Sequence, residues 1–92
     1  MIRSFLHRSL KELFETGRSG RVSGDLSKRA RQRLLVLNQA ANLKDLSIPG
    51  FDTHPLAGTI PQRYAIRVSG PWRVTFEFTK GDAWRVDLEQ YH

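Results

Sequence analysis

Apolar and polar residues alternate along three stretches in the second half of the chain, and this alternation constrains the fold more than any other feature. In residues 64–68, 72–78 and 84–91 nearly every second residue is aromatic or aliphatic, and most residues between them are polar or charged. A period of two places one kind of side chain on each face of a β-strand. The linkers 69–71 and 80–82 each contain a glycine, which suits tight connections. We therefore predict an antiparallel meander with one apolar and one polar face.

The apolar face of such a sheet needs a covering layer, and the first half of the chain supplies two helices for it. Residues 8–16 carry apolar side chains at helical spacing, and Gly17 follows where a helix often ends on a glycine. Asp25 can cap a second helix over residues 26–41, which has one narrow apolar stripe. With a short first strand over residues 2–5, the order is β-α-α-β-β-β. The predicted fold class is α+β, with two N-terminal helices packed on one face of a mainly antiparallel sheet.

The size and composition set further limits. Ninety-two residues, 39% of them hydrophobic, suffice for one two-layer core, so we expect a single domain over residues 1–92. No apolar run reaches the roughly 18 residues of a membrane helix, and no signal peptide is recognisable, so we expect a cytoplasmic protein without membrane contact. The sequence has no cysteine, which excludes thiol chemistry and cysteine-based zinc sites.

Positive charge is concentrated in the first half of the chain. Residues 1–46 contain ten basic and four acidic residues, a net charge of +6, whereas residues 47–92 contain five of each and are neutral. A basic surface of this kind favours a polyanion such as nucleic acid, or an acidic protein partner. The alternative is a solvated basic face without a partner. The candidate binding residues are Arg18, Arg21, Lys28, Arg29 and Arg31.

The alternation also predicts which residues meet across the sheet. We assume a three-residue turn at 69–71 and match the apolar faces of the last two strands. Trp72 and Trp84 then share the apolar face and are expected in the core. The predicted pairs are Val68 with Trp72, Arg67 with Arg73, Phe78 with Trp84, Glu77 with Arg85, Thr75 with Asp87 and Arg73 with Glu89.

The polar face continues to the last residues of the sequence. Tyr91 has the parity of Arg73 and Glu89, so it adjoins the opposed arginines Arg67 and Arg73. Arginine offers a rigid fork for phosphate oxygens, and histidine or tyrosine can transfer protons, so the set including His92 suits phosphodiester chemistry. The alternative is a set of long, solvated side chains with no chemical role.

Four stretches, in order and at nearly unchanged spacing, resemble the HigB toxins of the RelE superfamily, which are bacterial ribosome-dependent messenger-RNA endonucleases. The stretches are the opening "MIRSF.H..L..LFETG", the loop "THPLAG", the strand "WRVTFEF..GDA" and the closing "YH". The resemblance covers nearly the whole chain. It implies a toxin that cleaves mRNA in the ribosomal A site by attack of the ribose 2′-hydroxyl, without a metal or other cofactor.

The same resemblance implies roles for single residues. The catalytic set is His54, Arg73, Tyr91 and His92, and which of them acts as general base stays open. Substrate-binding positions are Ala57, Arg63, Arg67 and Gln90. The basic residues of the first half would contact ribosomal RNA.

The resemblance also implies a HigA-like helix-turn-helix antitoxin, which would be the chain's only connection to operator DNA. Two positions depart from the family pattern. Ala57 stands where the family usually has lysine, and Gln90 where it commonly has an acidic residue. The lost lysine removes a cation from the phosphate site. An attenuated or inactive member that only binds antitoxin or nucleic acid is therefore the alternative.

Overall fold

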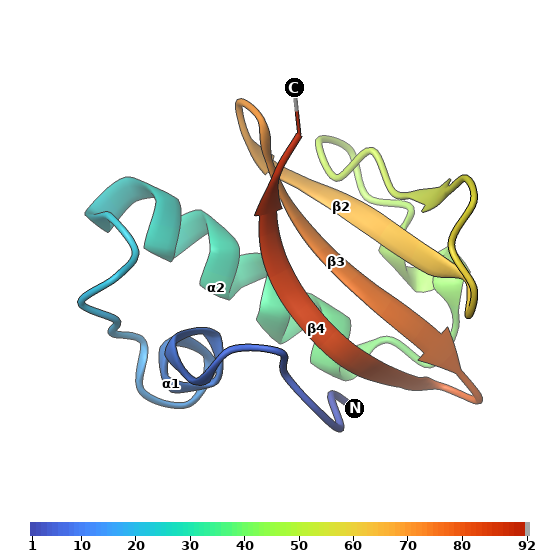
Figure 1. Ribbon diagram of the computed structural model, residues 1–92, viewed down its shortest axis with the longest axis horizontal. Coiled ribbons are helices and arrows are strands. Elements are labelled where there is room, and N and C mark those ends of the chain that lie inside the picture. The colour runs from blue at the N-terminus through green and yellow to red at the C-terminus, as the bar shows by residue number, and fades with distance from the viewer. Residues whose placement is uncertain (92) are drawn as a thin grey trace.

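The three alternating stretches form most of a four-stranded antiparallel sheet in the computed structural model, which describes residues 1–91 (Figure 1). The strands are β1 (His54–Leu56), β2 (Arg63–Ser69), β3 (Trp72–Thr79) and β4 (Asp82–Gln90), and they lie in that order across the sheet. The predicted meander is confirmed. The short strand β1, which was expected to be loop, adds an edge.

Two helices precede the sheet, and their ends follow local sequence signals. Helix α1 (Arg8–Thr16) ends at Gly17, whose φ of 79° is left-handed and costs a glycine little. Helix α2 (Gly24–Gln39) begins after Ser23. The N-cap is therefore Ser23 and not the expected Asp25, which lies in the first turn, where its negative charge suits the helix dipole. A short 3-10 helix, η1 (Leu43–Leu46), leads into the loop before β1.

The helices form one layer and the sheet forms the other, as predicted. Helix α2 contacts β2, β3 and β4, and α1 packs against α2 (Figure 1). The core between them contains fully buried Leu34, Leu37, Ile66, Val74 and Phe76. These residues come from the predicted apolar stripe of α2 and the apolar face of the sheet. Within residues 1–91, no helix is long and apolar enough to cross a membrane.

The opening residues lie along the outer edge of β4. Ile2 pairs with Ala83 and Phe5 pairs with Val86 as isolated parallel bridges. The N–H of Leu6 donates to the carbonyl of Val86 at 2.9 Å. The predicted first strand is therefore present only as two bridges, which still cover the β4 edge.

The hairpin between β3 and β4 is tighter than predicted. Lys80 and Gly81 have φ values of 53° and 81°, so both central residues of the turn are left-handed, as a two-residue hairpin of the primed type requires. Thr79 consequently pairs with Asp82. The register near the turn is shifted by one residue from the predicted one.

This shift moves Trp84 out of the core. Trp84 lies opposite Glu77 instead of Phe78 and is 42% exposed, so its expected place in the core is wrong. A bulge follows at Arg85, whose φ of 51° is left-handed, and the predicted register resumes beyond it. The predicted pairs Thr75 with Asp87 and Arg73 with Glu89 are confirmed.

The hairpin between β2 and β3 also contains an irregularity. Ser69, and not Val68, lies opposite Trp72, because the register shifts between Arg67 and Ser69. Trp72 packs against the core while partly exposed, in line with its expected apolar role. The pair of Arg67 and Arg73 is confirmed.

Candidate active site

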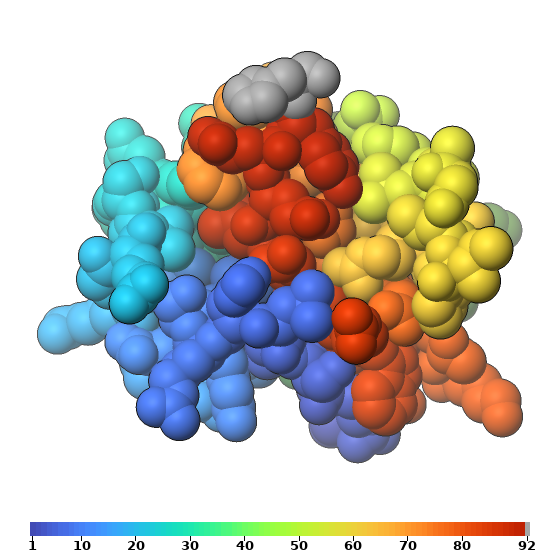
Figure 2. All heavy atoms as spheres, in the orientation of Figure 1, coloured from blue at the N-terminus to red at the C-terminus, as the bar shows by residue number. Residues whose placement is uncertain are grey.

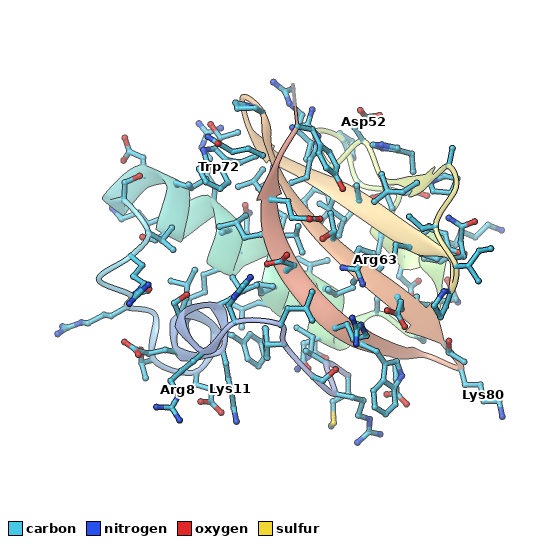
Figure 3. All side chains as sticks on the ribbon, viewed as in Figure 1. Arg8, Lys11, Asp52, Arg63, Trp72 and Lys80 are labelled. Atoms are coloured by element: carbon cyan, nitrogen blue, oxygen red, sulfur yellow. The ribbon has the colours of Figure 1, made fainter. Side chains whose placement is uncertain are left out.

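One face of the sheet carries most of its charged side chains, with Leu56, Ala65 and Trp84 among them, and it is turned away from α2. Directly paired residues of an antiparallel sheet have their side chains on the same face. The residues that share this face by register are Arg63, Arg67, Arg73, Thr75, Glu77, Asp87 and Glu89. Arg63 lies near the middle of it (Figure 3).

Arg63 is held by three partners at the centre of this face. Its guanidinium donates to Glu77 Oε2 at 3.2 Å, to Thr75 Oγ1 at 3.1 Å and to the carbonyl of Arg85 at 2.9 Å. Its side chain is only 17% exposed. A guanidinium engaged in this way organises the face and has little freedom to bind a phosphate. Arg63 was expected from the sequence to bind substrate, but its contacts within the protein indicate a structural role.

Glu89 connects this centre to the last described residue. Its Oε2 accepts from Thr75 Oγ1 at 2.6 Å and from the Tyr91 hydroxyl at 3.2 Å. Burial raises the pKa of the Tyr91 phenol, and the Glu89 carboxylate raises it further, while Arg63 acts in the opposite direction. The phenol consequently stays protonated at neutral pH. Parity placed Thr75 and Glu89 on the face, but their contacts were not expected.

Arg73 and Arg67 lie side by side toward the end of the sheet that carries Tyr91. The Arg73 guanidinium donates to the carbonyls of Gly70 at 2.7 Å and Trp72 at 2.9 Å, so it rests on the β2–β3 turn. The Arg67 side chain is exposed. Two adjacent cations at one end of a sheet face attract anions, although the Glu89 carboxylate lies directly opposite Arg73.

The backbone of Arg67 is fixed by α2 and by the loop before β1. Its carbonyl accepts from Arg33 Nε at 3.1 Å, and its N–H donates to the carbonyl of Phe51 at 2.6 Å. The Arg33 guanidinium in turn lies 4.6 Å from the centre of the Phe51 ring. Desolvation lowers the pKa of Arg33, and the neighbouring cations Arg29 and Arg67 add to this effect. Sequence reasoning gave Arg33 no role, because its contacts depend on tertiary structure.

The loop histidine lies on the β1 edge of the same sheet. His54 pairs with Ala65, which places it on the polar face by register. Its Nδ1 is 2.7 Å from the carbonyl of Asp52, a contact that orients the ring. Ala57 follows directly after β1 and is exposed. The structure therefore brings His54 to the edge of the face that carries Arg67 and Arg73.

A hollow of about 450 Å³ lies over the same face. Figure 2 shows β4 in red at the centre, with the N-terminal segment in blue and the loop before β2 in yellow on its two sides. The residues that line the hollow are Leu6, Thr59, Ile60, Pro61, Arg63, Glu77, Arg85 and Glu89. The hollow therefore lies over the centre of the face around Arg63, and Arg67, Arg73 and Tyr91 do not line it.

The remaining candidates at the chain end divide into two cases. Gln90 pairs with Trp72, is exposed, and by alternation faces away from Glu89. It therefore lies on the opposite side of the strand from the polar face. His92, the fourth expected catalytic residue, lies outside the described residues.

The expected ribosome-binding residues lie on the helical side of the molecule. Arg18, Arg21, Lys28 and Arg29 are exposed. Arg31 is partly buried, and its Nε donates to the carbonyl of Phe14 at 3.4 Å. Arg31 therefore links the two helices, whereas the other four are accessible. On α1, Arg8 and Lys11 also extend away from the protein (Figure 3).

A helical layer on an antiparallel meander, with arginines, a histidine and a phenol on the open sheet face, has the fold and residue set expected of a RelE-like toxin. Residues 3–92 match the family of HigB-like toxins, described as RelE-like toxins of type II toxin–antitoxin systems, and the chain belongs to this family. It is 37% identical to the Endoribonuclease HigB of Proteus vulgaris, over 92 residues that cover all of both chains. The resemblance seen in the sequence is thereby confirmed.

Proposed function

We propose that this chain is the toxin of a type II toxin–antitoxin system and an endoribonuclease that cleaves messenger RNA in the ribosomal A site. Membership of the toxin family and the likeness to a relative named as an endoribonuclease support the reaction class. The observation that carries the placement of the site is the gathering of Arg67, Arg73 and Tyr91 at one end of the polar sheet face. The antitoxin partner follows from the same family membership, with a HigA-like protein as the proposed form.

The proposed reaction begins with the ribose 2′-hydroxyl next to the scissile phosphate. Its oxygen loses a proton and attacks phosphorus, the bond from phosphorus to the 5′-oxygen breaks, and the departing oxygen takes up a proton. Negative charge develops on the phosphate oxygens between these steps. Fixed cations at that point stabilise the transition state. Arg67 and Arg73 are the proposed ligands of the phosphate, because Arg63 is engaged at the centre of the sheet.

Two kinds of proton-transfer group serve the remaining steps. Histidine exchanges protons near neutral pH, so His54 and His92 are the proposed exchangers with the 2′-hydroxyl and the leaving oxygen. Tyr91 stays protonated, because burial and Glu89 raise its pKa. It therefore serves as a hydrogen-bond or proton donor to the substrate rather than as the base.

The exposed basic residues of the helices support the proposed ribosome contact. Arg18, Arg21, Lys28 and Arg29 are solvent-exposed in and around the linker and first turns of α2. Several separate cations suit an extended array of RNA phosphates better than a single small anion. Arg31 contributes mainly by joining α2 to α1.

One alternative function has a specific observation in its favour. Ala57 offers no cation, and the Arg73 guanidinium is bonded to backbone carbonyls of the β2–β3 turn. A protein in this state could bind antitoxin or RNA without efficient cleavage. The cleaving function requires that Arg73 exchange these carbonyls for phosphate oxygens when the substrate binds.

Cleavage of mRNA on programmed ribosomes tests the proposal. The intact protein should cut in the A-site codon with a chelator present, and a variant without residues 91–92 should not cut. The truncated variant should still fold and bind a HigA-like antitoxin, because Tyr91 is exposed and lies outside the core. Equal cleavage by the two proteins would refute the catalytic role of the chain end. Antitoxin binding without cleavage by the intact protein would establish the binding module instead.

A further inference from the structure

We propose that the Glu89 carboxylate positions Tyr91 for the reaction, and that Thr75 and Arg63 hold Glu89 in place. This inference rests on the proposed endoribonuclease function and assigns a positioning residue within it. The residues form a continuous chain of hydrogen bonds from the centre of the sheet to the last described residue.

The first part of the chain of contacts is buried and well fixed. Arg63 donates to Thr75 Oγ1 at 3.1 Å, so that oxygen is an acceptor toward Arg63. The Thr75 hydroxyl then has its own hydrogen available, and it donates to Glu89 Oε2 at 2.6 Å. Thr75 is fully buried. A buried hydroxyl that both accepts and donates fixes its neighbours in one arrangement.

The second part of the chain of contacts fixes Tyr91, which directly follows β4. Here the backbone N–H of Tyr91 donates to the carbonyl of Pro71 at 2.8 Å, and its hydroxyl donates to Glu89 Oε2 at 3.2 Å. The backbone bond fixes where the residue lies, and Glu89 fixes where the phenol oxygen points. Gln90 cannot replace Glu89, because it faces the other side of β4.

The charges around the phenol have a direct chemical consequence. Glu89 and Asp87 of β4 are negative, and Arg63 of β2 is positive; all three influence the ionisation of Tyr91. Arg67 of β2 and Arg73 of β3 share the face by register, with His54 of β1 at its edge. The Glu89 carboxylate accepts a hydrogen bond from the Tyr91 phenol. Because of this bond, Tyr91 stays protonated until a substrate oxygen competes for the phenolic hydrogen. Glu89 thus acts on the reaction through Tyr91.

A spectroscopic titration tests the contact without any need for activity. Deprotonated tyrosine absorbs in the near ultraviolet, and the difference between the intact protein and Tyr91→Phe isolates Tyr91 from Tyr64. In Glu89→Gln the negative charge is lost and an acceptor oxygen is kept. Since Glu89 raises the pKa of Tyr91, the titration of Tyr91 should move to lower pH in this variant.

Single-turnover cleavage on ribosomes tests the effect on the reaction. Glu89→Gln should lower the rate at saturating protein on the order of tenfold to a hundredfold, with ribosome affinity unchanged, since misplacement of a reacting group acts on the chemical step. The alkaline limb of the pH–rate profile should shift in the same direction as the titration. Thr75→Val should have a weaker effect of the same kind, and Thr75→Ser, which keeps the hydroxyl, should restore the rate.

The outcomes separate this inference from the function on which it rests. If Tyr91 titrates identically in the intact protein and in Glu89→Gln, the contact does not position Tyr91, and the inference is overturned even though the intact protein cleaves RNA. A titration that moves while the cleavage rate stays the same also overturns it. If the intact protein cleaves no RNA but the titration moves, the proposed function fails, and the positioning role fails with it while the contact stands.

Discussion

Glu77 forms two ion pairs of equal length in very different surroundings, which provides a sharp test of how this sheet face is stabilised. Its Oε2 lies 3.2 Å from Arg63 Nη1 and 3.2 Å from Arg85 Nε. The Arg63 side chain is 17% exposed and the Arg85 side chain is 63% exposed. If distance governed the free energy, the two arginines would matter equally. If burial governs it, they differ strongly.

The expected magnitudes follow from the contacts. Arg85→Met removes an exposed ion pair, which typically contributes about 0–1 kcal/mol. Arg63→Met removes the donor to Glu77, to Thr75 and to the carbonyl of Arg85 at once. Unsatisfied groups of this kind cost about 1–3 kcal/mol each and are not additive, so we expect a loss of roughly 3 kcal/mol. For a domain of this size that corresponds to a fall in Tm of roughly 12–24 °C.

Urea unfolding followed by circular dichroism, with calorimetry as a second probe, measures both losses. Arg67→Met is the matched control, since Arg67 lies on the same strand and face but is exposed, and it should change the free energy of unfolding by less than about 0.5 kcal/mol. Equal losses for Arg63→Met and Arg85→Met would refute the reasoning, as would a loss for Arg63→Met no larger than that of the control.

Two further predictions concern the basic helix and the missing cation. Reversal of Lys28 and Arg29 to Glu should weaken ribosome binding and make it less dependent on salt, because fewer counterions are released; an unchanged salt slope in a binding titration would assign this surface to another partner. Ala57→Lys should raise single-turnover cleavage at least about tenfold with ribosome affinity nearly unchanged, because one added cation acts on the developing phosphate charge. Matching rates would leave Arg67 as the sufficient phosphate ligand.

The fold was readable from the sequence where one physical signal dominates. The alternation in residues 64–68 and 72–78 has a single period, and the stripe of α2 is narrow, so strands and helices were found near their true ends. Trp84 was misplaced because apolar parity was carried across a bulge. The two left-handed residues Lys80 and Gly81 fix a hairpin register that differs by one residue from the predicted register. The hydrophobic pattern does not show this difference. The conformation of the turn residues, and not the apolar pattern, therefore determines the register of this hairpin.

The sequence predicted which residues share the polar face of the sheet, but it did not predict the role of each residue there. Parity brought Arg67 and Arg73 to one side of the sheet, and the structure has them there together with Arg63, which the family resemblance had named. The sequence does not distinguish the engaged guanidinium of Arg63 from the exposed one of Arg67, because that difference depends on Glu77 and Thr75 across the strands. Burial and partner geometry, which are tertiary properties, assign the roles.

The pairing of the opening residues with β4 determines when this protein can complete its fold. Ile2 and Phe5 lie far from their partners Ala83 and Val86 along the sequence, so they can pair only after β4 has been made. The apolar face that α2 covers is likewise completed late, by β3 and β4. Contacts between such distant parts of a chain form slowly. The sheet face with Arg67, Arg73 and Tyr91 therefore cannot form on a nascent chain until β4 has left the ribosome.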